Sequence, residues 1–215
     1  MCSSEACLAY LLLVIIAAFA ALIYFLLLYR KKLFEKNNQL QFADAWEPMR
    51  ERAAQHSLKP ESCLFGIWQD KTLNVGVLFV KNSQNQVVAE VEYSGGARNW
   101  NLTISGQKYT IEHPLVLSGR IGYLKKTDGS IVATYYRGPS SLIKHEFRIP
   151  DVGVLIAKGP RLSLLYPFDY YLKGQLTGIT QAIHPIRTVG HIVAMPESYP
   201  LEVRVFILAI NASHL

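Results

Sequence analysis

An apolar run close to the N-terminus dominates the hydrophobic pattern of the chain. From Ala6 to Tyr29 the sequence contains no charged residue, no proline and no glycine, and Glu5 and Arg30 bound the run. As an α-helix, these 24 residues extend about 36 Å and exceed the ~30 Å hydrocarbon core of a bilayer. The pattern predicts a transmembrane helix over residues 6–29, preceded by a short extracytoplasmic tail over residues 1–5.

A cleaved signal peptide is the alternative interpretation of the same run. Ala18-Phe19-Ala20 matches the small-x-small pattern of a cleavage site. However, no lysine or arginine precedes the run, and nine further apolar residues follow the expected cut. These features favour a span that stays in the mature protein.

The charges that flank the run predict its orientation. The tail carries only Glu5, whereas four cations follow the run: Arg30, Lys31, Lys32 and Lys36. Because positive charge is retained on the cytosolic side, a single-pass membrane protein is expected, with its N-terminus outside and its C-terminal domain in the cytosol. Cys63 would be cytosolic and reduced. Cys2 and Cys7 flank the membrane, so no disulfide framework is expected.

Residues 30–62 are expected to form a basic juxtamembrane stretch and a helical connector. Leu40, Phe42, Trp46 and Met49 recur at loosely helical intervals among polar residues. Such a segment would either lie along the membrane surface or pack on the domain that follows. The pattern alone leaves both placements open.

Residues 63–215 are expected to form a β-rich domain. Ile143, His145, Phe147 and Ile149 alternate with polar residues, a period of two that is typical of a strand with one buried face. His145 would therefore lie on the inner face of its strand. Glycine and proline pairs divide the rest of the segment into short strands, without a long helical pattern between them.

Two hairpins can be located from their turn residues. Ser105-Gly106 separates two alternating segments, and closing that turn places Leu102 opposite Tyr109 on one face. Asp128-Gly129 marks a second hairpin before a strand over residues 131–136. The agreement between turn position and apolar face favours an antiparallel sheet.

The last apolar segment, residues 201–210, leaves almost no polar face. It is too short for a second membrane span and suits a buried element. Its Val and Ile residues favour a final strand, whereas Pro200 at its start and Glu202 in its first turn favour a helix. A helix with apolar residues on all sides must be enclosed, and a large barrel offers an interior that needs filling.

This combination of elements resembles the tubby-like superfamily, which includes phospholipid scramblases and LURP-one-related proteins. The resemblance covers about residues 63–212 and rests on the turn-and-strand pieces 128–133 and 144–149 and on the apolar segment 201–210. It implies a mainly β fold, an antiparallel closed barrel of about twelve strands around a hydrophobic C-terminal helix, here preceded by one transmembrane helix. The resemblance also implies lipid binding. The chain lacks the cysteine-rich acylation cluster of scramblases and has its membrane span at the N-terminus, so we do not extend the scrambling activity of the family to it.

The charge of the domain adds a candidate ligand. Residues 93–187 hold twelve Lys or Arg against five Asp or Glu, a balance of +7. A cationic solvated surface would explain this balance, and so would a face turned toward anionic headgroups, which attract each nearby cation by about 1 kcal/mol. We hypothesise a non-enzymatic module that binds anionic phospholipid at the cytosolic membrane surface. The predicted lipid-binding residues are Arg98, Arg120, Lys125, Lys126, Arg137, Lys144 and Lys158.

No catalytic residue, metal ligand or cofactor is predicted. The sequence holds no zinc-ligand spacing, glycine-rich phosphate loop or G-x-S-x-G motif, and its dispersed cations argue against nucleic acid. Residues 141–144 match S-x-x-K, but that pattern needs a helical turn, and Lys144 opens an alternating strand. The competing hypothesis is a scaffold or accessory subunit of a membrane protein complex. It depends on the aromatic residues within 166–171, which would form an exposed contact loop unless their rings fill the core.

Overall fold

The structure is a computed structural model of the chain and describes residues 4–70, 75–94, 99–116, 119–138, 144–159, 167–183 and 190–213. The chain divides into two compact units, residues 1–39 and residues 40–215.

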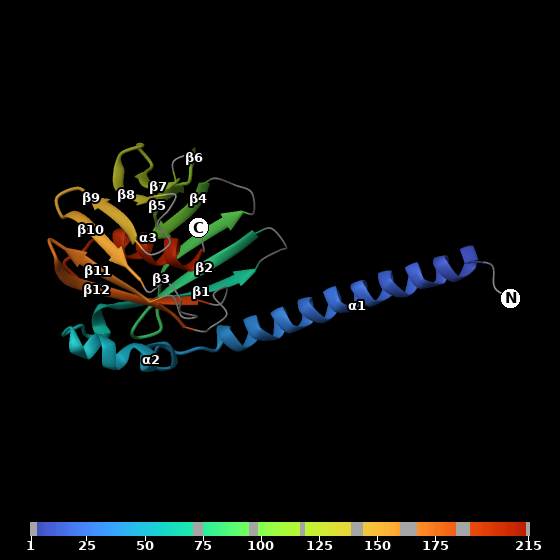
Figure 1. Cartoon of the computed structure of the whole chain (residues 1–215). Helices are drawn as coiled ribbons and strands as arrows, with labels where there is room; N and C mark the ends of the chain where they lie inside the picture. Colours follow the sequence, from blue (N-terminus) through green and yellow to red (C-terminus); the bar gives the residue numbers. More distant parts are fainter. Residues whose placement is uncertain are drawn as a thin grey trace. The chain divides into compact units, whose positions relative to one another are not determined.

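The first unit contains helix α1, Ser4–Asn38 (Figure 1). The helix includes the whole apolar run that the sequence shows, and its side chains are described at residues 12–25, 28, 29, 32 and 35. These side chains are exposed all round the helix, as Leu12, Phe19 and Phe25 illustrate. Among the described residues, no helix combines the length and the apolar character needed to cross a membrane.

In the described residues, the second unit holds two α-helices, one 3₁₀ helix and thirteen strands. The helices are α2 (Phe42–Gln55), η1 (Pro60–Ser62) and α3 (Leu201–Ala212). The strands are β1 (Cys63–Asp70), β2 (Val75–Asn82), β3 (Val87–Ser94), β4 (Asn99–Ile104), β5 (Gln107–Glu112), β6 (Leu115–Val116), β7 (Gly119–Lys126), β8 (Ile131–Arg137), β9 (Lys144–Ile149), β10 (Gly153–Lys158), β11 (Phe168–Leu172), β12 (Gln175–Ala182) and β13 (Gly190–Ala194).

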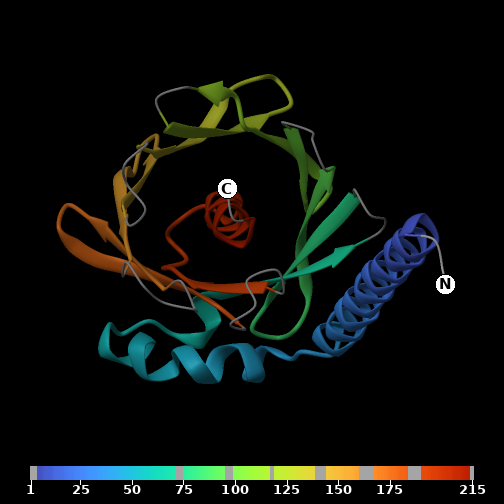
Figure 2. The same cartoon turned by 45° about the vertical axis from the view of Figure 1, so that its right-hand side comes forward.

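The strands form a closed antiparallel barrel (Figure 2). Each strand pairs with the next along the chain from β1 to β5 and again from β7 to β13. The pairs β5–β7 and β13–β1 close the ring, so twelve strands make the wall and β6 is a short addition beside β7. Because the number of wall strands is even, the antiparallel alternation closes without a mismatch. The expected mainly β, closed antiparallel barrel is confirmed.

Both hairpins have the expected turns. Leu102 pairs with Tyr109 across β4 and β5, and the turn residues Ser105 and Gly106 have φ values of 48° and 83°. Two consecutive positive φ angles are the signature of the type I′ turn that matches the twist of a hairpin. Asp128-Gly129 lies in the turn between β7 and β8, where the sequence predicted the second hairpin.

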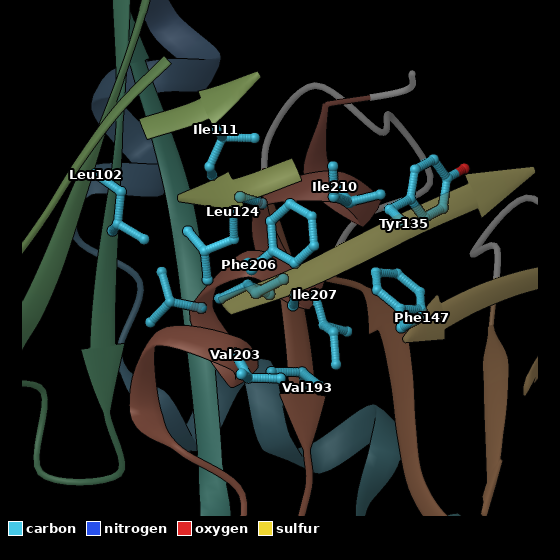
Figure 3. Packing of buried hydrophobic residues seen from close by; sticks show 14 of the residues in the cluster. Leu102, Ile111, Leu124, Tyr135, Phe147, Val193, Val203, Phe206, Ile207 and Ile210 are labelled. Atoms are coloured by element: carbon cyan, nitrogen blue, oxygen red, sulfur yellow. The ribbon is translucent and has the colours of Figure 1, made fainter. Parts of the chain in front are cut away.

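Helix α3 lies inside the barrel, where Figure 2 shows it end-on within the ring of strands. Its buried residues are Val203, Val205, Phe206, Ile207, Leu208, Ala209, Ile210 and Ala212. Phe206 packs against Phe147 of β9 with 6.0 Å between the ring centroids, among the wall residues of Figure 3. A ring of twelve strands is too wide for wall side chains alone to fill, so the helix supplies the missing apolar volume. The helical alternative for residues 201–210 is therefore confirmed.

Helix α2 packs on the outer face of the barrel. Its buried residues Phe42, Ala45, Met49 and Ala53 form a second apolar cluster with outward side chains of β1, β12 and β13. All five residues of β13 are consequently buried, as expected for a strand that is covered on both faces. Of the two placements left open for the connector, packing on the domain is the one that residues 42–55 have. The compact unit begins at residue 40, upstream of the domain boundary that we expected at residue 63.

The alternating strand directions divide the connections between two ends of the barrel. The hairpin end carries residues 83–86, 105–106, 127–130, 150–152 and 173–174, and α3 begins there. The loop end carries residues 71–74, 95–98, 113–118, 138–143, 159–167 and 183–189, and α3 finishes there. Most loop-end connections lie outside the described residues, but the flanking strands fix the end at which each of them begins and finishes.

Candidate functional site

Charge is divided unequally between the two ends of the barrel. The loop-end connections contain no Asp or Glu but four cations: Lys71, Arg98, Arg161 and Arg187. The hairpin-end connections contain Lys173 together with Asp128 and Asp151. The segments that lead into β1 and α3 at that end add Glu61 and Glu197 against Lys59. Counted over the connecting segments alone, the loop end is therefore basic and the hairpin end is slightly acidic.

Four of the predicted lipid-binding residues extend this charge onto the strand ends. Arg120 pairs in register with Arg137 across β7 and β8, and Lys144 pairs with Lys158 across β9 and β10. Because β8 and β9 are neighbours, these four residues form one row along the loop-end rim, which we call the cation row. Arg98 lies outside the described residues, in a loop-end connection.

Part of the cation row faces the barrel interior. Arg137 follows the buried Tyr135 by two residues and so shares its inward face, as does the directly opposite Arg120. Lys158 neighbours the buried, inward Ala157 in sequence and therefore lies on the outward face. The row thus presents cations both to the mouth of the barrel and to its outside.

The charge of Lys158 is not cancelled by the nearest strand carboxylate. Lys158 is exposed, and its Nζ lies 4.9 Å from the ring centroid of Tyr171. Its register partner on β11 is Asp169, whose carboxylate is bound by the guanidinium of Arg52 from α2. The carboxylate of Asp169 is therefore already paired with Arg52, and the ammonium group of Lys158 can interact with an external anion.

Lys125 and Lys126 lie at the opposite, hairpin end of the barrel. The Nζ of Lys125 is 2.6 Å from the Oε2 of Glu112, so this pair is locally neutral. Lys126 lines a cavity of about 670 Å³ together with Lys108, Asp128 and Glu202. The structure therefore separates the seven predicted residues into a loop-end group and a hairpin-end pair.

Behind the arginine pair lie two buried polar side chains whose hydrogen-bond donors are unused among the described residues. Tyr135 is 1% exposed and His145 is 6% exposed, and their ring centroids lie 5.6 Å apart, edge to face. Both ring nitrogens of His145 lack a partner. The Tyr135 oxygen can accept from the guanidinium of Arg137, which leaves the O–H proton of Tyr135 without an acceptor. Figure 3 shows the Tyr135 hydroxyl directed away from Ile210. Buried polar groups normally have partners, so this cluster is an exception to be explained.

The protonation states of these two residues follow from their burial. Burial lowers the pKa of His145 to about 4, and the nearby Arg137 and Arg120 lower it further, so the imidazole is neutral at pH 7. Burial also raises the pKa of Tyr135 to about 12, against the opposing effect of the same two arginines, so the phenol keeps its proton. The cluster therefore offers neutral donors beside two permanent cations.

His113 adds a third buried nitrogen on the inner side of β7. A Cβ placed on Gly122 would lie 3.2 Å from the Nδ1 of His113, so glycine makes room for the imidazole. The Nε2 of His113 has no partner among the described residues, and burial lowers the pKa of this side chain to about 4. Its ring lies 4.5 Å from that of Trp100, so one side of the imidazole is apolar.

Other candidate chemistry finds little support in the described part of the chain. No group of three or more His, Cys, Asp or Glu among the described side chains is arranged to hold a metal ion. Cys63 is buried, and burial raises the pKa of its thiol to about 12, which makes it unreactive. Of the aromatic residues in 166–171, Phe168 and Tyr170 are buried in the barrel core, and position 166 lies outside the described residues.

The predicted list of ligand residues contained the two arginines but neither Tyr135 nor His145. A signal for Tyr135 was present, because Tyr135 and Arg137 are two residues apart in a predicted strand and so share a face. His145 was placed on an inner face correctly, but its neighbourhood depends on which strands are adjacent. That adjacency is a property of the closed sheet and not of any one segment.

Comparisons with known proteins give no match: no family model and no curated protein matches the sequence, and no solved structure matches the fold. The resemblance to the tubby-like superfamily therefore stays a prediction.

Proposed function

We propose that this protein is a membrane-anchored, non-enzymatic module that binds anionic phospholipid at the cytosolic membrane surface, through the loop end of its barrel. The observation that carries the proposal is the division of charge between the two ends. The loop-end connections hold four cations and no carboxylate, and the cation row adds four more positive residues beside them. A concentrated cationic surface of this kind suits a layer of anionic headgroups.

Membrane anchoring through α1 is supported by the sequence of residues 6–29. The run has no charged residue, and the described apolar side chains within it are exposed all round the helix. A helix that is apolar on every side is unfavourable in water, because its apolar surface is hydrated. It is stabilised where a bilayer or another protein surrounds it. The four cations that follow the run favour a cytosolic position for the barrel.

The expected strength of lipid binding follows from the charges. Each Lys or Arg held near an anionic leaflet contributes about 1 kcal/mol, so four engaged cations would favour binding about a thousandfold. The same connections carry apolar residues, including Leu117, Leu142 and Leu164. Apolar side chains between cations add affinity by entering the boundary between headgroups and acyl chains. For a barrel already tethered to the membrane, such contacts would set its orientation on the surface.

Vesicle cosedimentation tests the proposal. The compact unit, residues 40–215, would be mixed with phosphatidylcholine vesicles that contain increasing fractions of anionic phospholipid, after a thermal melt has shown that the fragment is folded. Binding should rise with the anionic fraction and fall steeply toward about 0.5 M salt, where exposed charges are largely screened. Binding that ignores both variables would contradict the proposal. A stoichiometric protein partner recovered in mild detergent would then favour the accessory-subunit alternative.

A further inference from the structure

We infer that the loop-end mouth of the barrel contains a seat for a single phosphate group, formed by Arg120, Arg137, Tyr135 and His145. The inference deepens the proposed function and rests on it in one respect, that the phosphate belongs to a lipid headgroup. The seat itself would equally accept the phosphate of a soluble ester, because the recognised chemistry is the same.

The first argument is the geometry of the inward face. Arg120 and Arg137 are directly opposite each other in the β7–β8 ladder, on the face that Tyr135 shares. The ring of His145 lies 5.6 Å from that of Tyr135 and belongs to the adjacent strand β9. Three neighbouring strands therefore direct four polar side chains toward one region of the mouth.

The second argument is the supply of unused donors. Both nitrogens of His145 and the O–H proton of Tyr135 have no hydrogen-bond partner among the described residues, although both side chains are more than nine-tenths buried. A neutral imidazole and a phenol each provide one donor, and each guanidinium provides five. An arginine that also has another partner would therefore keep donors for a ligand.

The charges of the site favour an anionic ligand. Two guanidinium groups that lie directly opposite each other in a ladder are both attracted to an anion placed between them. Guanidinium groups bind the oxygens of phosphate with a two-pronged geometry that ammonium groups lack. A cation is unsuited to this site, because the described groups around it are two guanidiniums and two neutral donors.

Capping of α3 does not account for the cluster. At the loop end, the Ala209 carbonyl accepts from the backbone N–H of Ser213, and the Ile210 carbonyl accepts from the Ser213 hydroxyl. The Ala212 carbonyl accepts from the indole of Trp68. These last-turn carbonyls therefore have partners other than the arginines.

Calorimetric titration of the full chain with inorganic phosphate tests the seat. The protein would be held in a neutral detergent, with chloride adjusted to keep the ionic strength constant. One saturable phosphate site per chain is expected. In mixed micelles with phosphatidic acid, the lipid phosphate should compete, so that added phosphate no longer binds. Phosphate binding that is unchanged in those micelles would identify a soluble ester as the source.

Matched variants locate the site. Tyr135→Phe removes only the hydroxyl and should weaken phosphate binding about tenfold, and Arg137→Gln should weaken it by about tenfold to a hundredfold. Tyr136→Phe changes the adjacent residue on the opposite face and should leave the affinity unchanged. A thermal melt of each variant shows that the comparison is between folded proteins.

The outcomes separate the seat from the proposed function. No saturable phosphate binding by the wild-type chain, or equal weakening by Tyr135→Phe and Tyr136→Phe, would overturn the seat, even where vesicles still respond to charge. Saturable binding that Tyr135→Phe weakens would support the seat, even where vesicle binding ignores lipid charge and the proposed function fails.

Discussion

The indole nitrogen of Trp68 in β1 donates a hydrogen bond of 3.0 Å to the carbonyl oxygen of Ala212, the last residue of α3. A second contact lies nearby, because the Nδ2 of Asn211 donates to the Tyr170 hydroxyl at 2.7 Å. Both bonds satisfy polar groups at the loop end of the enclosed helix. The first bond joins α3 to β1 and the second joins α3 to β11, so the fold is complete only when the C-terminus has entered the barrel.

A charge placed in the middle of α3 should therefore unfold the domain. Leu208 is fully buried in the barrel core, and Leu208→Asp would bury an unpaired carboxylate there. We expect a loss of several kcal/mol in the free energy of unfolding, enough to remove most of the stability of a typical domain. Urea unfolding followed by circular dichroism measures this loss.

The matched control for that change is Ile131→Asp. Ile131 is 48% exposed on the barrel surface, so the same new charge should alter the free energy of unfolding by about 0.5 kcal/mol or less. Equal stability of the two variants would show that α3 does not form the core. Removal of residues 200–215 should unfold the domain in the same way as Leu208→Asp.

A glycine in β1 allows α3 to lie close to the wall. A Cβ on Gly66 would lie 2.9 Å from the Cδ1 of Leu78 and 3.2 Å from the Cδ2 of Leu208. Gly66→Ala should therefore cost about 1–3 kcal/mol through overpacking. Gly138→Ala is the control, because its nearest atom would be 3.8 Å away. Thermal melts that shift equally for both variants would contradict this close packing.

Local rules predicted the elements of this fold, and closure of the sheet determined the rest. The Ser105-Gly106 hairpin, the inner face of His145 and the enclosed helix at 201–210 each follow from a short segment and its burial. The pairing of β5 with β7 and of β1 with β13 joins segments whose sequences carry no mark of each other. For the same reason, the sequence predicted the basic residues as one group and could not separate Lys125 and Lys126 from the cation row.

Acid should destabilise the domain through its buried histidines. The pKa of His145 is lowered to about 4 by burial and by Arg137 and Arg120, and burial alone lowers that of His113 to about 4. Between pH 6.5 and pH 4 the unfolded chain binds protons that the folded chain does not. Stability should therefore be fully present above pH 6.5 and fall as the pH drops toward 4, with His145 contributing on the order of 3 kcal/mol.

Urea unfolding at a series of pH values checks this dependence. His145→Gln should flatten the profile in that window, whereas His56→Gln, at the exposed C-terminal end of α2, should leave its slope unchanged. A profile of the wild-type protein that is flat from pH 6.5 to pH 4 would show that neither imidazole is held neutral by burial.

The buried thiol of Cys63 dictates how membrane topology can be measured. Cys63 is 0% exposed and its pKa is raised to about 12, so an impermeant thiol reagent should not label it until the domain is unfolded. A cytosolic position is better tested at Ser130, which is exposed in the β7–β8 turn. Ser130→Cys, in a chain with its natural cysteines replaced by serine, should be labelled only after the cells are permeabilised. Labelling of this residue in intact cells would reverse the predicted orientation.

Vesicle binding by two charge-matched double variants tests the central claim most directly. Lys144→Gln with Lys158→Gln removes two cations from the loop end, and Lys108→Gln with Lys126→Gln removes two from the hairpin end. On vesicles rich in anionic phospholipid, the loop-end variant of residues 40–215 should bind about thirtyfold more weakly, because each cation contributes about 1 kcal/mol. The hairpin-end variant should bind like the wild type. Equal loss of binding in both variants, or no loss in either, would contradict binding through the loop end.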